Sequence, residues 1–218
     1  MVVPLFFPSP ADKDCSRDFV RVVKISVGRK EAPFLVHPDI ISRESPWFRT
    51  ALEGEWKTKD RLTDVQLPAD DPKTFALFLK WVYTEKLWQE DFKEGNLDFS
   101  IVVPLYLFAK KVHAPRCQNA LLAYVYGEKD NIKAIPVETF VALDKDLDQN
   151  DGLARLIVNW FIINGTKAGL TPELFTKAPK FTHHMVNLYM RNAEKDRIRP
   201  LAFSKLEKFQ VLENDDKK

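Results

Sequence analysis

The chain has 218 residues, of which 45% are hydrophobic, and it carries 33 basic and 31 acidic side chains. This composition predicts a globular protein with enough apolar material for a core, and it excludes a disordered chain. The formal net charge of +2 at pH 7 gives no strong field toward nucleic acid or an anionic membrane, so we expect neither as a partner.

The cysteines and the first ten residues indicate the compartment. Cys15 and Cys117 do not form a disulfide framework, which favours a reducing environment. The opening MVVPLFFPSP is apolar, but it lacks a basic residue and is interrupted by three prolines, unlike a secretory signal. No window has the roughly 18 apolar residues of a spanning helix. We therefore expect an intracellular protein, cytoplasmic or nuclear.

The first third of the chain predicts short strands followed by short helices. Residues 20–28 have the alternation of a half-buried strand, and residues 34–36 predict its hairpin partner after a loop longer than two residues. Pro38 and the Ser45-Pro46 pair predict two successive helix starts, because serine caps a helix and proline fits its first turn. Residues 65–67 predict a third strand.

Helices are predicted from residue 71 onward. Asp71 and Pro72 predict a cap and a first turn, and one helical face then carries Phe75, Phe78, Leu79, Val82 and Tyr83. Pro104 predicts a helix start or a kink within the next segment. The further segments expected to be helical are 98–112, 114–127, 136–143, 153–163, 172–177 and 181–190. Strands early and helices late predict an α+β fold, a small β-sheet covered by helices.

As a set, these elements resemble the BTB/POZ domain, in the version found in many fungal proteins. The residues that carry the resemblance are Phe34, Val36, His37, Ser45, Phe48, Asp71, Pro72 and Tyr83. The likeness covers residues 20–128 and implies a BTB/POZ fold, a small β-sheet flanked by a cluster of short α-helices. Outside it we expect an N-terminal segment, 1–19, as a candidate exchanged strand. We also expect an α-helical extension, 131–195, and a charged, mobile tail, 196–218.

The resemblance implies a non-enzymatic protein–protein interaction module that forms homodimers and docks protein partners. It implies no catalysis, no cofactor and no small-molecule substrate. The candidates for dimerisation are the apolar residues of the N-terminal segment, which would add a strand to a sheet edge: Val2, Val3, Leu5, Phe6 and Phe7. Trp47 and Trp56 are candidates for partner binding, because tryptophan is enriched at interface hot spots, while Trp47 has packing of its short helix as the alternative.

Two narrower functions stay open within the resemblance. One is a substrate adaptor for a cullin-based ubiquitin ligase, and the other is a transcription-related scaffold. Adaptors of this family often have an apolar residue, any residue and a glutamate after the second short helix. This chain has Trp56, Lys57 and Thr58 there, and the missing glutamate argues against a cullin scaffold as partner.

Candidate catalytic and metal-binding residues lack the neighbours that such chemistry needs. His37 has no histidine at ligand spacing, so we expect it to hold a strand–helix junction. Cys117, on an apolar helix face, is expected to pack in the core. We predict no catalytic, cofactor or metal site.

The segment 144–151, DKDLDQND, imitates a calcium-binding loop through Asp144, Asp146 and Asp148. A calcium loop needs a glycine at its sixth position and a glutamate at its twelfth, where this chain has Gln149 and Arg155. We therefore interpret the segment as an acidic turn that caps the following helix.

Overall fold

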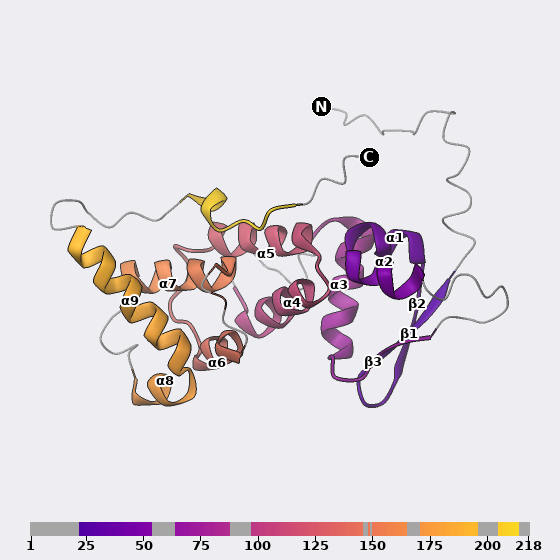
Figure 1. The fold of residues 1–218 in the computed structure, drawn as a ribbon, viewed down its shortest axis with the longest axis horizontal. Helices are drawn as coiled ribbons and strands as arrows, with labels where there is room; N and C mark the ends of the chain where they lie inside the picture. The colour runs from indigo at the N-terminus through magenta and orange to yellow at the C-terminus, as the bar shows by residue number, and fades with distance from the viewer. Residues whose placement is uncertain are drawn as a thin grey trace, which may run out of the picture. The chain divides into compact units, whose positions relative to one another are not determined.

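The structure is a computed structural model that describes residues 22–53, 64–87, 97–145, 148, 150–164, 171–195 and 205–213. The fold is α+β, with a small three-stranded mixed sheet and a long series of helices (Figure 1). The described residues form two compact units, one ending at Phe75 and the other beginning at Ala76. This division falls within α3 (Pro72–Thr84), and each unit is described by itself.

The sheet of the first unit has β1 (Val23–Val27) as its middle strand. β2 (Ala32–Val36) pairs with β1 antiparallel, and β3 (Asp64–Leu67) pairs with β1 parallel. The hairpin loop is longer than two residues, as predicted, and it starts at Gly28, whose φ of +78° favours glycine. The sheet order, β2-β1-β3, combines a local hairpin between β1 and β2 with a pairing between β1 and β3, which are distant in sequence.

Two short helices, α1 (Pro38–Glu44) and α2 (Pro46–Glu53), follow the hairpin and lie side by side (Figure 1). Both predicted starts are confirmed. Pro38 is the first residue of α1, and the backbone N–H of Phe48 donates a 3.2 Å hydrogen bond to Ser45 Oγ at the start of α2. A first-turn proline thus sets the start of each helix locally, and α2 also has a serine cap.

Aromatic rings form the centre of the core in this unit. Phe48 and Phe75 are fully buried, with ring centroids 6.3 Å apart, and Phe34 meets Phe75 edge-on at 4.9 Å. Phe34 lies opposite Ile25 in the sheet, so this face of the sheet carries the core. The buried aliphatic residues of the unit include Ile25, Val27, Val36, Ile41, Leu52 and Leu67.

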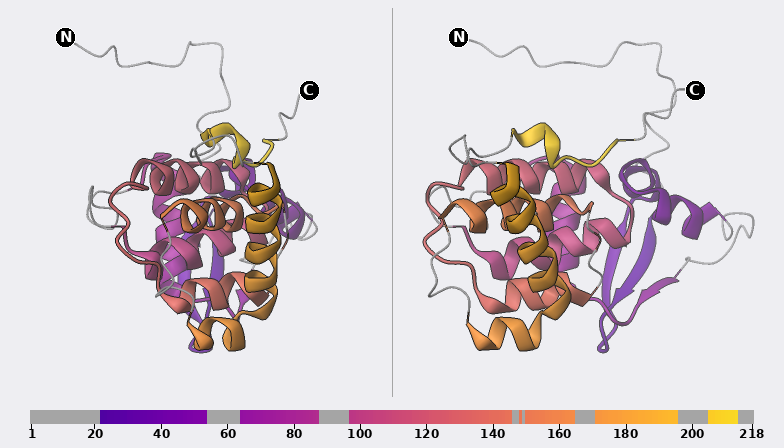
Figure 2. Two further views of the ribbon diagram at one scale, coloured as in Figure 1. Left: turned by 90° about the vertical axis from the view of Figure 1, so that its left-hand side faces the viewer. Right: turned by 60° about the vertical axis from the view of Figure 1, so that its left-hand side comes forward.

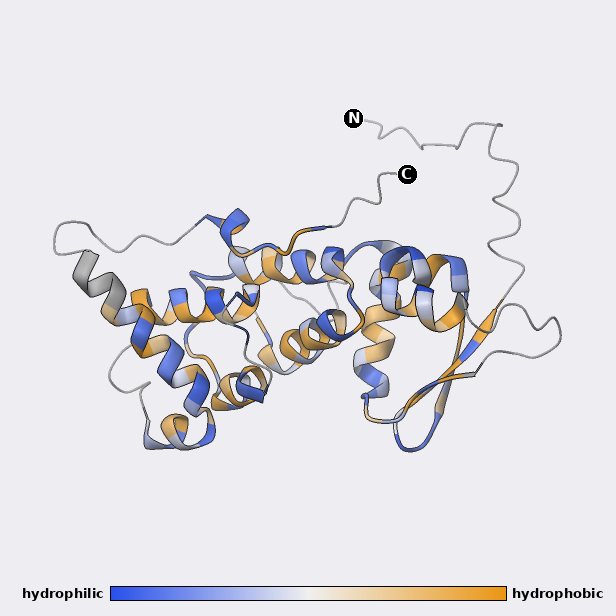
Figure 3. Cartoon of the chain, viewed as in Figure 1, coloured by the Kyte–Doolittle hydropathy of each residue, from blue (hydrophilic) through white to orange (hydrophobic). Residues whose placement is uncertain are grey.

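The second unit is built from helices that begin with the remainder of α3. The later helices are α4 (Phe99–Lys111), α5 (Pro115–Gly127), α6 (Val137–Lys145), α7 (Gly152–Asn164), α8 (Pro172–Lys177), α9 (Pro179–Lys195) and the 3₁₀ turn η2 (Leu206–Lys208). Figure 2 shows α9 running across α7, with which it makes contact, and α4 packs against α5. Figure 3 shows apolar and polar residues interleaved along these helices, as expected for helices with one buried face.

Of the two alternatives for Pro104, a helix start is wrong and a kink stays a prediction. Pro104 lies inside α4, because the helix begins at Phe99 and is capped by Asp98, which accepts a 2.8 Å hydrogen bond from the backbone N–H of Ser100. Tyr83 is not on the buried face of α3, since 43% of it is exposed, whereas Trp81 is only 2% exposed. The buried arc of α3 runs through Phe78 toward Trp81, which turns Tyr83 outward.

Candidate interaction surfaces

The outer face of the sheet exposes apolar side chains. Leu35 lies opposite Lys24, on the face away from the aromatic core, and 66% of it is exposed. Val22, just before β1, is also exposed. β2 is an edge strand of the described sheet, so Leu35 stands on a strand whose outer side is available for pairing.

Trp47 has features of both roles predicted for it, partner binding and packing of its short helix. It lies in the first turn of α2, half-buried, and its ring meets that of Phe48 edge-on with centroids 4.9 Å apart. The contact with buried Phe48 places the indole beside the core, and its intermediate burial leaves part of the side chain exposed. A partly exposed tryptophan is a suitable anchor for a protein partner.

The other predicted partner-binding and dimerisation residues lie outside the described residues. They are Trp56, Lys57 and Thr58, and Val2, Val3, Leu5, Phe6 and Phe7. Their roles stay predictions.

The residues that carry the family resemblance have mixed burial. Val36, Ser45 and Phe48 are buried, Phe34, His37 and Pro72 are half-buried, and Asp71 and Tyr83 are exposed.

Two of these residues hold helix starts. Asp71 accepts hydrogen bonds from the backbone N–H and the hydroxyl of Thr74, at 2.9 and 3.1 Å, and so caps α3 as predicted. The carbonyl of His37 accepts a 3.2 Å bond from Ile41 N–H. His37 therefore occupies the strand–helix junction where the sequence placed it.

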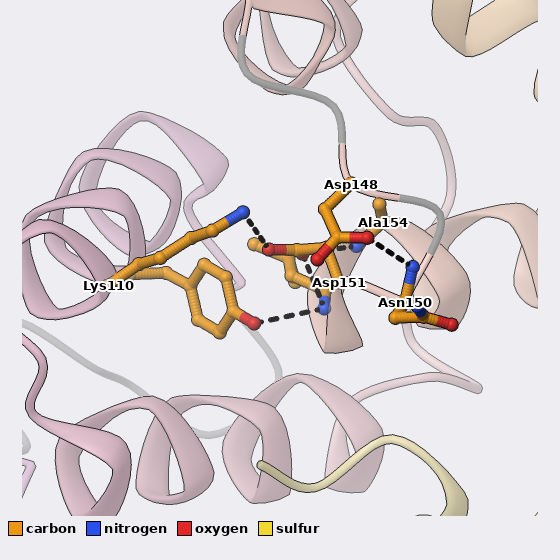
Figure 4. Close-up of polar contacts among 7 residues, drawn as sticks. Lys110, Asp148, Asn150, Asp151 and Ala154 are labelled. Carbon is orange, nitrogen blue, oxygen red and sulfur yellow. Dashed lines mark hydrogen bonds and ion pairs between the residues drawn. The ribbon is translucent and has the colours of Figure 1, made fainter.

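In the second unit, a buried polar cluster joins α4 to the start of α7 (Figure 4). Lys110 Nζ lies 2.7 Å from Asp151 Oδ2. The other oxygen of Asp151 accepts hydrogen bonds from the backbone N–H groups of Leu153 and Ala154, both at 3.1 Å. The hydroxyl oxygen of Tyr106 accepts a longer bond, 3.4 Å, from the same Leu153 N–H.

The electrostatics of this cluster favour a structural role. Burial, and then the nearby charge of Asp151, raise the pKa of Tyr106 well above its ordinary value, so the phenol stays neutral. Both oxygens of Asp151 are engaged, by Lys110 and by the first turn of α7. The cluster therefore caps one helix and ties it to another, and the interpretation of the acidic turn as a helix cap is confirmed for Asp151.

Asp144, at the other end of the same acidic segment, also caps a helix, but a distant one. This buried carboxylate accepts a 2.7 Å hydrogen bond from Phe181 N–H in the first turn of α9. Across the described residues, no group of three or more His, Cys, Asp or Glu side chains is placed to hold a metal ion. Cys117 is fully buried, as predicted.

The sequence reasoning missed a clamp on the C-terminal segment. The side-chain amide of Asn119, in α5, donates a 2.9 Å hydrogen bond to the carbonyl of Val211 and accepts a 2.7 Å bond from its N–H. Asn119 and Val211 are 92 residues apart, and no local pattern marks such a pair.

The C-terminal part of the second unit also exposes apolar side chains. They are Phe175 on α8 and Val186, Tyr189 and Met190 on α9. Among the described helices, none has both the length and the apolar character needed to cross a membrane. Comparison of the sequence with protein-family models and with curated proteins finds no match.

Proposed function

We propose that this chain is a non-enzymatic protein–protein interaction module of the BTB/POZ type, which forms homodimers and docks protein partners. Support comes from the order of its elements: a hairpin, two short capped helices, a third strand and then helices. Ser45 and Asp71, which are among the residues that carry the family resemblance, cap α2 and α3.

The observation that carries the proposal is the edge strand β2 with its exposed Leu35. An edge strand pairs readily with an added strand, which supplies main-chain hydrogen bonds, and an exposed leucine adds apolar contact. In the proposed dimer, the apolar segment around Val2–Phe7 of one copy adds to the sheet of the other. Trp47 then serves as an anchor for further partners.

Sedimentation of the full chain and of residues 11–218, at matched concentrations, tests the dimer. We expect the full chain to dimerise, and we expect removal of residues 1–10 to weaken the dimer by at least tenfold. The substitution Leu35→Glu should weaken it similarly, because a carboxylate would have to lose water within the interface.

Phe175→Glu is the matched control, since it places the same charge on another exposed apolar side chain, in the second unit. We expect it to leave the dimer intact. A full chain that sediments as a monomer at all concentrations would refute the homodimer. A dimer broken by Phe175→Glu and not by Leu35→Glu would place the interface elsewhere.

The docking role of Trp47 is tested by the proteins that co-purify with the tagged chain. We expect Trp47→Ala to reduce recovery of specific partners at least tenfold, whereas Tyr189→Ala, at an exposed aromatic residue of α9, leaves it unchanged. Equal recovery by both variants would remove Trp47 from the docking surface.

A further inference from the structure

The segment 205–213 lies along α5 in an irregular conformation, apart from the short turn η2 (Figure 1, yellow). Asn119 binds both main-chain groups of Val211, and its Nδ2 also lies 2.8 Å from Glu213 Oε1. The paired N–H and C=O contacts are those that a neighbouring strand would offer. Asn119 therefore binds the main chain at Val211 and the acidic side chain two residues further on.

Phe209 anchors the same segment two residues earlier. Phe209 is 3% exposed, and its ring centroid lies 6.4 Å from that of Tyr126. The guanidinium carbon of Arg155 lies 5.9 Å from the centroid of the Phe209 ring. Tyr126 belongs to α5 and Arg155 to α7, so residues of both helices surround the ring. A buried aromatic ring beside a cation is a frequent anchor in peptide recognition.

Gly152, the first residue of α7, lets the main chain of the segment approach. A Cβ atom on Gly152 would overlap the carbonyl oxygen of Phe209 and lie 2.9 Å from Leu122 Cδ1. Its position is fixed from the other side by Asp151, which caps α7 and pairs with Lys110. The glycine thus provides a close-fitting floor under the peptide backbone.

The three features form one site with an aromatic anchor, a glycine floor and a main-chain clamp. The segment contacts the bundle through alternate residues, because Phe209, Val211 and Glu213 make the contacts described above, whereas Gln210 and Leu212 are exposed, Leu212 to 90%. What holds the segment is therefore a short pattern, an aromatic residue followed two positions later by an aliphatic one, with an acidic residue two positions further on.

We propose that the α5–α7 surface is a peptide-docking site for a partner protein that presents an extended Phe-x-Val-x-Glu type segment. The chain's own residues 205–213 occupy this site in cis and compete with the partner. The tether to α9 keeps the cis segment at a high effective concentration, of the order of millimolar for a short linker, so the free site is a minor state. This site belongs to the second unit and does not depend on the dimer proposed above.

The test uses the full chain with Phe209→Ala, which removes the anchor of the cis segment, and a fluorescent peptide of residues 205–213, KLEKFQVLE. Fluorescence anisotropy should show at least tenfold tighter binding of the peptide to Phe209→Ala than to the unmodified chain. Adding Asn119→Ala to that variant should abolish the gain, and so should replacing the phenylalanine of the peptide by alanine.

Equal affinity of the peptide for the unmodified chain and for Phe209→Ala would overturn the proposal. A second measurement covers the case in which Phe209→Ala does not fold. In the unmodified chain, excess unlabelled peptide should speed hydrogen exchange at the amide of Val211, which is bonded to Asn119 Oδ1, and the alanine-substituted peptide should not. No change in exchange would overturn the proposal independently.

A third measurement separates a partner protein from a second copy of this chain. Copies carrying donor and acceptor dyes on the C-terminal segment and on α5 are mixed. We expect no energy transfer between copies. Transfer that is lost on adding Asn119→Ala would show that the segments exchange between copies, and it would overturn the assignment to a partner protein.

Discussion

Polar side chains cap helices locally in both units, and in the second unit they also bond groups across long stretches of sequence. Ser45 and Asp71 each bond a backbone N–H three residues ahead. In the second unit, the side chains of Lys110, Asp144 and Trp160 bond groups 31 to 41 residues away. The first pattern can form with its helix, whereas the second needs the packed bundle. Substitutions that remove the two kinds of bond should therefore differ in how much unfolding free energy they cost and in how many helices they affect.

Asp144→Ala should have the largest effect. It leaves the buried N–H of Phe181 without its acceptor and removes the tie between α6 and α9, which we expect to cost about 2–3 kcal/mol of the free energy of unfolding. Urea denaturation measures the change. Asp144→Asn keeps an acceptor and should recover part of the loss, and Asp148→Ala, which removes an exposed turn contact with Asn150 N–H, should cost much less. Equal costs for Asp144→Ala and Asp148→Ala would contradict the expected difference between long-range and local bonds.

Alkaline pH should weaken the second unit through Tyr106, whose pKa is raised above the ordinary value of 10.0 by burial and by the charge of Asp151. The folded chain keeps a proton that the unfolded chain loses, so this stability is fully present below pH 10 and is lost as the pH rises further. Between pH 10 and 11 the free energy of unfolding should fall by about 1 kcal/mol more in the unmodified chain than in Tyr106→Phe, because the unfolded tyrosine is only half ionised at pH 10. Parallel pH profiles of the two proteins would contradict this expectation.

Two buried tryptophans among the described residues of the second unit, Trp81 and Trp160, offer a closer contrast. Trp160 Nε1 donates a 2.9 Å bond to the carbonyl of Lys129, whereas Trp81 Nε1 has no hydrogen-bond partner within the part of the chain that the structure describes. Both changes to phenylalanine leave a void, but only Trp160→Phe also loses a hydrogen bond. We expect it to cost about 1 kcal/mol more than Trp81→Phe, measured by urea denaturation. The reverse order would mean that the long-range bond contributes nothing.

Ser45→Ala should have the smallest effect, about 0.5–1 kcal/mol, because it removes one local cap. Its reach should also be short. Hydrogen exchange should speed up at the amide of Phe48 and in the first turn of α2, and it should not change in α6 or α9. Faster exchange throughout the second unit would show that the cap acts well beyond its own helix.

The same difference explains how much of the fold could be predicted. Helix starts at Pro38, Ser45 and Asp71 were predictable because the cap and the helix lie within four residues of each other. The parallel pairing of β3 with β1 was not, because a strand carries no mark of its neighbour. The wrong expectation for Tyr83 has a similar cause, since the helix period gives a face but not the direction of its partner.

The candidate sites divide in the same way. A tryptophan in a helix with an apolar face is visible in the sequence, and Trp47 is indeed half-buried on α2. The docking site on α5 and α7 rests on Asn119, Gly152 and Phe209, which are ordinary residues in the sequence and gain meaning only when the bundle brings them together. Trp56 and the N-terminal apolar segment lie outside the described residues, so their roles await experiment.

Gly152 has a consequence for how this chain can change during evolution. Its own helix would accept alanine readily, since alanine is the best helix former. The carbonyl oxygen of Phe209 is the main obstacle to a side chain there, because it belongs to the backbone, whereas Leu122 Cδ1, 2.9 Å from the added Cβ, is the end of a flexible side chain. Replacement of this glycine by alanine should be harmful in chains that retain the C-terminal segment and much less costly in chains that have lost it. The cost of one mutation would then depend on a stretch of sequence more than fifty residues away, and lineages that discard the segment should fill the position more readily.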